Sequence, residues 1–259
     1  MQKSRFERGT IVISIDDGDA DGFRVYENIF KKYQLSATYN IVTSLIGDAD
    51  RLTREQLQIL HNDPLIEIAA HGHTHQNDDE DIAKSIECLY EWLDIKKDAI
   101  GFASPGSKMR NEFAEENAER LRSMKLLYVR TGRNSKTNPQ QLAFREALIA
   151  QGAPDFLYRN TPQLYYKFEG FCVNSAAIVH ERSVEDMKKM VELAAEERAC
   201  VVLTFHRFKK PGEENYEGKW CYDYDSFAEF AEYLSQMRDA GKIDVLTNEQ
   251  AYLLGRTQE

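Results

Sequence analysis

The sequence lacks any long hydrophobic run, since no apolar stretch approaches the roughly 18–20 residues that a membrane-spanning helix needs. It also lacks an excess of basic residues, because 43 acidic side chains outnumber 33 basic ones and give a formal net charge of −10. Proteins that bind nucleic acid through its phosphates have the opposite balance. The sequence therefore predicts neither a membrane partner nor a nucleic-acid partner.

Cysteine is scarce, and its spacing excludes two further classes of site. The four cysteines show no CxxC pattern, so we expect neither a cysteine zinc site nor a disulfide framework. Cys88 and Cys200 lie in apolar segments, where a free thiol behaves as a small hydrophobic side chain. No apolar segment precedes the first predicted strand, as a signal peptide requires, and we therefore expect a cytoplasmic protein.

Short apolar runs alternate with amphipathic stretches along the chain. Hydrophobic residues make up 42% of its 259 residues, which is typical of a folded protein with a sizeable core. The predicted strands are 11–15, 37–42, 66–70, 100–104, 126–130, 171–179, 200–205 and 243–247. Because strands that alternate with helices form parallel sheets, about eight such units favour a closed or nearly closed barrel over an open sheet.

Three helix boundaries can be read from the sequence. Thr53 and Gln56 have the spacing of a capping box, and Ser183 suits the N-cap of a second helix. Gly241 follows the apolar stripe of a third helix at the position where helices often end. The alternation breaks at 131–170, a polar stretch with three prolines, which we predict to be an insertion or a long loop.

Polar residues gather at the carboxyl ends of the predicted strands, where parallel barrels build their active sites. Asp16 and Asp17 directly follow the first strand, and His71-Gly-His-Thr-His75 follows the third. His206 follows the seventh. Four of the six histidines therefore fall at the rim that carries the paired aspartates.

This set of residues favours a metal site. Two adjacent carboxylates at the end of a buried strand repel each other, and a cation relieves that repulsion. The same pair also suits a turn or a helix N-cap. If a helical turn follows the strand, His71 and His75 share one face of it, whereas in a continued strand all three histidines of the segment share a face. Imidazole is a common ligand of transition metals. A histidine-rich surface loop is the alternative.

One aspartate and two histidines leave coordination positions open, which is the pattern of catalytic rather than structural zinc sites. An ion held in this way acidifies water and polarises a carbonyl group. The remaining aspartate can then act as a general base, and His206 can protonate a leaving group.

The motifs resemble those of the polysaccharide deacetylase family, the chitooligosaccharide-deacetylase-like domains of carbohydrate esterase family four. Four segments carry the resemblance to the family motifs T-F-D-D-G, A-T-F-F-V, H-x-x-x-H and L-x-x-H: Ser14-Ile-Asp-Asp-Gly18, Ala37-Thr-Tyr-Asn-Ile41, His71 with His75, and Leu203-Thr-Phe-His206. The resemblance extends from residue 10 to about residue 254. We therefore predict one polysaccharide-deacetylase-like catalytic domain over residues 1–259.

The resemblance implies an α/β fold, a distorted (β/α) barrel with seven or eight mostly parallel strands. It implies that Asp16 is the general base and His206 the general acid. It also implies that Asp17, His71 and His75 hold one divalent metal ion. Zinc is the first candidate, although iron, cobalt, nickel and manganese suit the same ligands.

The sequence departs from the family at its third motif, R-x-P-[YF]. Residues 103–106 read Ala-Ser-Pro-Gly, so only the proline is kept. Arg130 ends the neighbouring strand, and we predict that it takes the place of the missing arginine beside Asp16 through a two-pronged hydrogen bond. A surface ion pair is the alternative for Arg130.

Other polar and aromatic residues near the predicted rim leave alternatives open. The family's Asp-Trp motif is not visible. Trp220, Tyr222 and Tyr224 lie in or beside the stretch 207–222, which we predict to be a loop, and they either stack on a sugar ring or anchor the next helix. His73 is expected to pack beside the metal ligands rather than to join them.

The leading hypothesis is a metal-dependent deacetylase that hydrolyses an N-acetyl or O-acetyl group on a carbohydrate, with metal-activated water as the nucleophile. One alternative is a cytoplasmic hydrolase of a small non-peptide amide, of the cyclic imide or ureide type. Another is an inactive carbohydrate-binding barrel, which Asp16 and His206 disfavour because a binding protein needs neither base nor acid. The expected partner is therefore a carbohydrate or a small amide, and nothing in the sequence specifies an oligomeric state.

Overall fold

The computed structural model describes residues 4–131, 146–147, 150, 164–168 and 170–256. Its strands are β1 (Gly9–Ile15), β2 (Ala37–Ile41), β3 (Ile66–Ala70), β4 (Ile100–Ala103), β5 (Leu126–Thr131), β6 (Cys172–Asn174), β7 (Ala176–Ala177), β8 (Cys200–Phe205), β9 (Arg207–Lys209), β10 (Cys221–Asp223) and β11 (Ile243–Leu246). Most of the predicted insertion at 131–170 lies outside the described residues.

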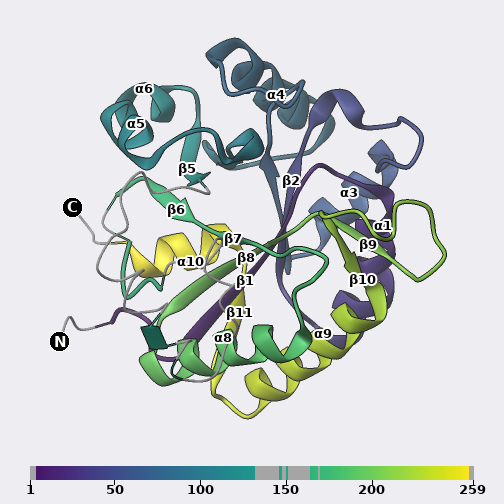
Figure 1. Cartoon of the computed structure of the whole chain (residues 1–259). Coiled ribbons are helices and arrows are strands. Elements are labelled where there is room, and N and C mark those ends of the chain that lie inside the picture. The colour runs from purple at the N-terminus through teal and green to yellow at the C-terminus, as the bar shows by residue number, and fades with distance from the viewer. Residues whose placement is uncertain (1–3, 132–145, 148–149, 151–163, 169, 257–259) are drawn as a thin grey trace.

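The helices surround the strands (Figure 1). They are α1 (Ala20–Val25), continued by a π-helical turn (Tyr26–Phe30) and α2 (Lys31–Tyr33), then α3 (Arg54–Asn62), α4 (Asp79–Trp92), α5 (Asn111–Glu116), α6 (Ala118–Ser123), α8 (Val184–Glu197), α9 (Tyr224–Asp239) and α10 (Asn248–Gly255). None of the helices in the described part of the chain combines the length and hydropathy that a membrane span requires.

The large sheet closes into a distorted barrel. Its strand order is β6-β5-β4-β3-β2-β1-β8-β7, and each of these neighbouring pairs is parallel. β6 pairs with β5 and β7 pairs with β8, while only Ser175 separates β6 from β7, so this short segment joins the two ends of the sheet. β11 pairs with the first half of β1. The predicted fold class is confirmed.

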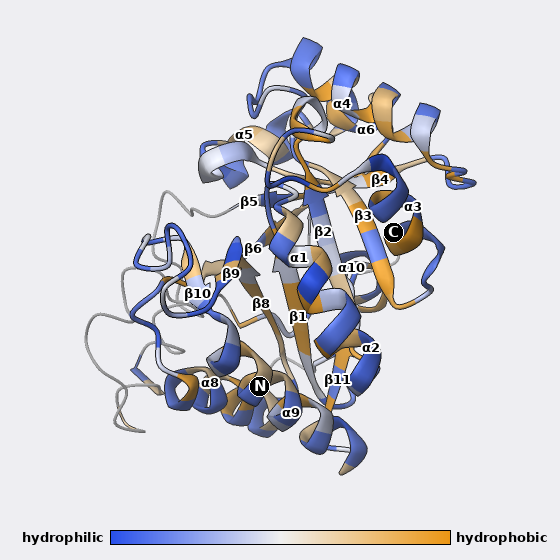
Figure 2. Ribbon diagram, turned by 90° about the vertical axis from the view of Figure 1, so that its right-hand side faces the viewer, coloured by the Kyte–Doolittle hydropathy of each residue, from blue (hydrophilic) through white to orange (hydrophobic). Residues whose placement is uncertain are grey.

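Burial explains why the predicted strands form where they do. β1, β2, β3, β4 and β8 are buried along their whole length, as continuous apolar runs covered on both faces should be. Helices α8 and α9 instead alternate between hydrophilic and hydrophobic residues (Figure 2), and their apolar side chains face the sheet.

The three helix boundaries are also confirmed. Thr53 Oγ1 accepts a hydrogen bond from the Gln56 backbone at 3.2 Å, and the Gln56 side chain accepts one from the Thr53 backbone at 2.9 Å. Ser183 Oγ accepts a hydrogen bond from the Asp186 backbone at 3.1 Å at the start of α8. Gly241 follows α9 with a φ of +70°, which glycine adopts at little cost.

The prediction that 207–222 is a loop was wrong at both ends of the stretch. β9 and β10 form a two-stranded parallel ladder, and we call residues 207–223 the β9–β10 arm. Phe208 is fully buried against Phe205 and Phe227, and Tyr222 contacts Phe205. These aromatic contacts anchor two strands that are too short to have a recognisable sequence period.

Polar contacts tie the arm to the helical segment after β1, beside which it lies in Figure 1. Asp21 accepts a hydrogen bond from the Phe208 backbone at 3.1 Å, and its carboxylate lies 3.5 Å from Lys209 Nζ. Arg24 donates to the Phe208 carbonyl at 2.7 Å and to both carboxylate oxygens of Glu213 at 2.7 and 3.0 Å. The arm is therefore held in place beside the rim of the barrel.

Asp21 should give folding a specific pH dependence. Burial, with the neighbouring charge of Asp19, raises the pKa of Asp21 to about 6, although Lys209 opposes the shift. Because the folded pKa lies above the unfolded one, this stabilising contribution is complete below the unfolded pKa and is lost as pH rises through about 6. Between pH 4.5 and 7.5, wild type should lose about 2 kcal/mol of unfolding free energy relative to Asp21→Asn.

Urea unfolding of both proteins at the two pH values measures this difference. Asp94→Asn is a matched control, because the Asp94 side chain is 77% exposed on the surface. If Asp21→Asn and Asp94→Asn change the pH dependence equally, the buried carboxyl of Asp21 is not its source.

Candidate active site

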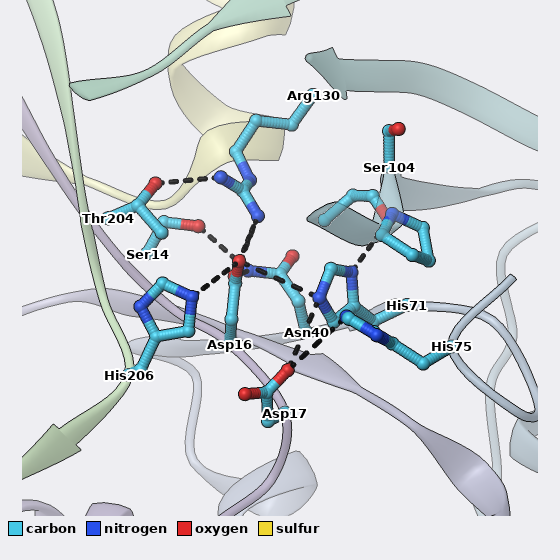
Figure 3. A network of polar contacts seen from close by, with 12 residues as sticks. Ser14, Asp16, Asp17, Asn40, His71, His75, Ser104, Arg130, Thr204 and His206 are labelled. Atoms are coloured by element: carbon cyan, nitrogen blue, oxygen red, sulfur yellow. Dashed lines mark hydrogen bonds and ion pairs between the residues drawn. The ribbon is translucent and has the colours of Figure 1, made fainter. Parts of the chain in front are cut away.

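The carboxyl ends of four strands bring the predicted site residues together (Figure 3). Two follow β1, two follow β3, one is in β5 and one follows β8. They are Asp16, Asp17, His71, His75, Arg130 and His206. Contacts between them cross the barrel rim: Asp16 hydrogen-bonds Arg130, which is 114 positions away in the sequence, and lies 3.8 Å from His206.

Asp17, His71 and His75 form the one group of three converging metal-ligating side chains among the described residues. Asp17 Oδ1 lies 3.5 Å from His71 Nε2 and 3.6 Å from His75 Nε2. Both separations are long for a hydrogen bond. Two atoms that share a tetrahedral ion at ~2.0–2.2 Å lie roughly 3.3–3.6 Å apart, so the three side chains fit a divalent transition metal.

The orientation of His71 supports this fit. Its Nδ1 lies 2.7 Å from the Ala103 carbonyl oxygen, and a ring nitrogen in contact with a carbonyl carries the hydrogen. Nε2, which faces Asp17, is then left with its lone pair, as a metal ligand requires. Burial lowers the pKa of His71, but the charges of Asp16 and Asp17 outweigh it and raise the pKa. The pocket therefore favours positive charge.

Asp17 has the electrostatics of an anionic ligand. Burial by itself raises its pKa, but the close contact with His71 and the charges of His71, His206 and His75 lower the pKa far below its usual range. The carboxylate is therefore ionised at any pH at which the protein would work. Its backbone has a φ of +75°, in the left-handed region, as Asp tolerates better than most residues.

The loop that carries His75 is held by Asp81, which sequence reasoning missed. Its carboxylate accepts hydrogen bonds of 2.6–3.0 Å from the backbone N–H groups of His73, Thr74 and Gln76 and from the Thr74 hydroxyl. Gly72 is required here, because a Cβ on it would lie 2.6 Å from Asp81 Oδ2. An acidic residue in the first turn of a helix is so common that it gave no signal of this contact.

His73 lies beside the metal ligands without joining them, in keeping with the expectation for it. Its Nδ1 is 2.9 Å from Thr43 Oγ1, and its ring is thereby directed to the segment after β2. The predicted pair of histidines, rather than all three, therefore faces Asp17.

Asp16 is paired with Arg130 inside the rim. Arg130 Nη2 donates to both carboxylate oxygens, at 2.7 and 2.6 Å, and Nη1 donates to Thr204 Oγ1 at 2.7 Å and Ser175 Oγ at 2.8 Å. The predicted two-pronged bond thus takes a different form, with one nitrogen serving both oxygens and the other anchored on hydroxyls. Arg130 is 3% exposed and does not form the surface ion pair that was its alternative.

Asn40 is a second partner of Asp16. Its side-chain N–H donates to Asp16 Oδ1 and to Ser14 Oγ, both at 2.8 Å. The sequence segment around Asn40 was recognised, but no role was assigned to the side chain. The available signal was an amide in a fully buried strand at a position where the family motif has phenylalanine.

The neighbours of Asp16 keep it ionised. Burial raises its pKa, but the charges of Arg130, His71 and His206 outweigh that effect, and the net pKa lies below the ordinary value. His206 Nε2 lies 3.8 Å from Asp16 Oδ2. Burial lowers the pKa of His206 more than the two aspartates raise it. The site therefore holds an ionised carboxylate and, 3.8 Å from it, an imidazole of lowered basicity.

These features define a (β/α) barrel with an Asp–His–His ligand set and a separate buried carboxylate at its carboxyl rim. A family model described as polysaccharide deacetylase matches residues 3–124, which include both aspartates and both ligand histidines. The N-terminal part of the chain therefore matches the polysaccharide deacetylase family, as its motifs predicted. Curated protein sequences give no significant match.

Three solved structures are similar to this chain to different extents. A family 4 acetyl xylan esterase from Clostridium thermocellum, in complex with a cobalt ion, is similar over 95% of this chain and 91% of its own, with 11% identity and a TM-score of 0.50. BC0361, a polysaccharide deacetylase from Bacillus cereus, is similar over 69% of this chain and 50% of its own, with 14% identity and a TM-score of 0.47. IcaB from Ammonifex degensii is similar over 46% of this chain and 58% of its own, with 21% identity and a TM-score of 0.39.

This chain thus spans 58% of the length of IcaB and 50% of that of BC0361. The similarity to the esterase extends over nearly the whole of both chains and supports the barrel fold.

Proposed function

We propose that the protein is a metal-dependent deacetylase that hydrolyses an acetyl group on a carbohydrate, with an N-acetyl amino sugar as the favoured substrate. One observation carries the proposal. The Asp17–His71–His75 ligand set lies directly beside a buried, ionised Asp16, with His206 on its other side. The family match over residues 3–124 supports the same reaction class.

Asp17, His71 and His75 would hold one divalent ion, with zinc or another first-row transition metal suited to two nitrogens and one carboxylate oxygen. When bound, such an ion supplies an acidified water molecule and a positive charge for the carbonyl oxygen of the substrate.

The remaining groups of the site accept and donate protons. Asp16 is ionised and held by Arg130 and Asn40, so it accepts the proton of the attacking water at its carboxylate. His206 Nε2, on the other side of Asp16, donates a proton to the departing nitrogen. Asp16 and His206 therefore act as base and acid, while burial keeps bulk water from competing for the same protons.

Arg130 should tune the base rather than hold the metal. Arg130→Met removes the largest charge that lowers the pKa of Asp16, so that pKa should rise and the acidic limb of the pH–rate profile should move to higher pH. Arg130→Lys should recover only part of the turnover, because an ammonium cannot contact Asp16, Thr204 and Ser175 with one planar group.

Metal content should be the same in wild type and in both Arg130 variants. Unchanged kinetics and pH profile in Arg130→Met would contradict this role.

Acetate release from a panel of substrates tests the proposed function. The panel holds N-acetyl chitooligosaccharides and acetylated xylan, which are assayed for acetate, and small cyclic imides, which release no acetate and are assayed for ring opening. Each substrate is tested with and without a chelator. We expect acetate from the amino sugars, lost with the chelator and restored by adding a divalent metal. Hydrolysis of a cyclic imide alone, or no hydrolysis of any substrate by metal-loaded protein, would overturn the proposal.

A further inference from the structure

His206 is partly buried, and no hydrogen bond fixes its ring. In the described part of the chain its Nδ1 has no hydrogen-bond partner. Its Nε2 lies 3.8 Å from the nearest oxygen of Asp16, which is an electrostatic contact rather than a hydrogen bond. A histidine that transfers protons normally has its second nitrogen oriented by a carboxylate or a carbonyl group. Some other contact must therefore orient this imidazole.

The ring of Trp220 supplies that contact. Its centroid lies 5.0 Å from that of the His206 ring, with 41° between the two planes. Trp220 is 43% exposed, so part of its indole faces water while the ring contacts the imidazole. Lys219 Nζ also lies over the indole, 4.8 Å from the ring centroid. The ring already packs against two groups of the protein, which supports a role in holding His206 rather than in stacking on a sugar.

The β9–β10 arm fixes the position of Trp220. The Arg207 backbone N–H, next to His206 in the sequence, donates to the Trp220 carbonyl at 3.2 Å. Cys221 pairs with Arg207 in the ladder, and Arg207 Nε donates to Asp19 Oδ1 at 3.2 Å. The chain thus leaves the site at His206 and returns to it at Trp220, with both ends held to each other.

We propose that Trp220 is a positioning residue for His206: it holds the imidazole with Nε2 directed at the reaction centre and stabilises the imidazolium through its ring face. This inference rests on the proposed function, in which His206 is the general acid. Residues 219–223 are polar and aromatic in sequence without any family motif, so the assignment comes from the arm's geometry alone.

Steady-state kinetics on an acetylated amino sugar test the proposal through Trp220→Ala and Trp220→Phe. A misplaced catalytic group costs up to about 100-fold, so Trp220→Ala should lower kcat about 10- to 100-fold with KM within about twofold. Trp220→Phe keeps a ring beside His206 and should recover most of the turnover. A rise in KM with unchanged kcat would show a sugar platform and overturn the proposal, as would unchanged kinetics.

Trp92→Phe is the matched control, because Trp92 is the other of the two tryptophans in the chain and lies on α4 against Arg54. It should leave kcat and KM unchanged. All variants should bind the same amount of metal.

Proton NMR of the His206 ring gives a readout that does not depend on turnover. In wild type its ring protons should be shifted by the aromatic ring current of Trp220, with His206→Gln used to assign the signals. The shift should vanish in Trp220→Ala and persist in Trp92→Phe. If no acetylated sugar is hydrolysed, the proposed function fails while the ring contact is still measured. If sugars are hydrolysed and Trp220→Ala matches wild type in kinetics and NMR, only the role of Trp220 fails.

Discussion

Asp16→Asn should keep the metal and lose turnover by about 10²–10⁴-fold, the usual contribution of a positioned base. Asparagine has nearly the same shape and still accepts hydrogen bonds from Arg130 and Asn40, but it cannot accept a proton. Asp16 is not one of the three converging ligands, so elemental analysis should find about as much metal as in wild type. A loss of less than about tenfold in a folded, metal-loaded variant would remove Asp16 from the role of base.

The variant has a stability cost that must be separated from its catalytic effect. Asp16→Asn leaves the guanidinium of Arg130 buried without its counter-charge, and breaking such a pair costs about 3–5 kcal/mol. Arg130→Met instead leaves the carboxylate of Asp16 buried without its counter-charge. The double variant Asp16→Asn/Arg130→Met removes both charges and should unfold at a higher temperature than either single variant. Turnover should stay as low in the double variant as in Asp16→Asn, although stability recovers.

The barrel could be predicted from the sequence because its strands are buried on both faces. Continuous apolar runs located β1, β3 and β8 to within two residues at each end. The segment 171–179 was predicted as one strand, but it forms two strands, one on each side of Ser175, that pair with different partners. A hydrophobic run shows that a segment is buried but does not show which strand lies beside it.

The β9–β10 arm escaped prediction for a different reason. Its strands are three residues each, which is too short for a period-2 pattern, and the residues between them are polar. What fixes the arm is remote in sequence, since Asp21 and Arg24 contact Phe208 from more than 180 positions away. Composition gives the polarity of such a segment, but tertiary contacts decide its structure.

The convergence of Asp17, His71 and His75 was predictable because these residues follow strand ends at short spacings, and parallel strands bring those ends together. Arg130 could be placed for the same reason. Asn40 and Asp81 could not, since each acts through hydrogen bonds to backbone or carboxylate groups of another segment. Asp81 is of an ordinary residue type for a first helical turn and gives no signal. Asn40 gives one, an amide where the family motif has phenylalanine, but that signal does not identify Asp16 as its partner.

Removing either histidine ligand should abolish metal binding. Wild type should bind about one divalent ion per chain, and His71→Ala or His75→Ala should leave no binding at low micromolar metal, because two ligands rarely hold a transition metal against water. Metal content after dialysis, measured by elemental analysis, and a competition titration with a chromogenic chelator give occupancy and affinity. The affinities should be compared at one pH, because protons compete with the metal for imidazole.

His73→Ala is the matched control, since it removes a histidine from the same loop. The His73 ring contacts Thr43 rather than Asp17, so this variant should retain the full metal content. Loss of metal in His73→Ala alone would show that His73, rather than His71 or His75, is the histidine ligand. Full occupancy in the double variant His71→Ala/His75→Ala would place the metal outside this site altogether. The expected order, in which His71→Ala and His75→Ala lose the ion and His73→Ala keeps it, follows from which imidazole nitrogens lie within 3.6 Å of Asp17 Oδ1.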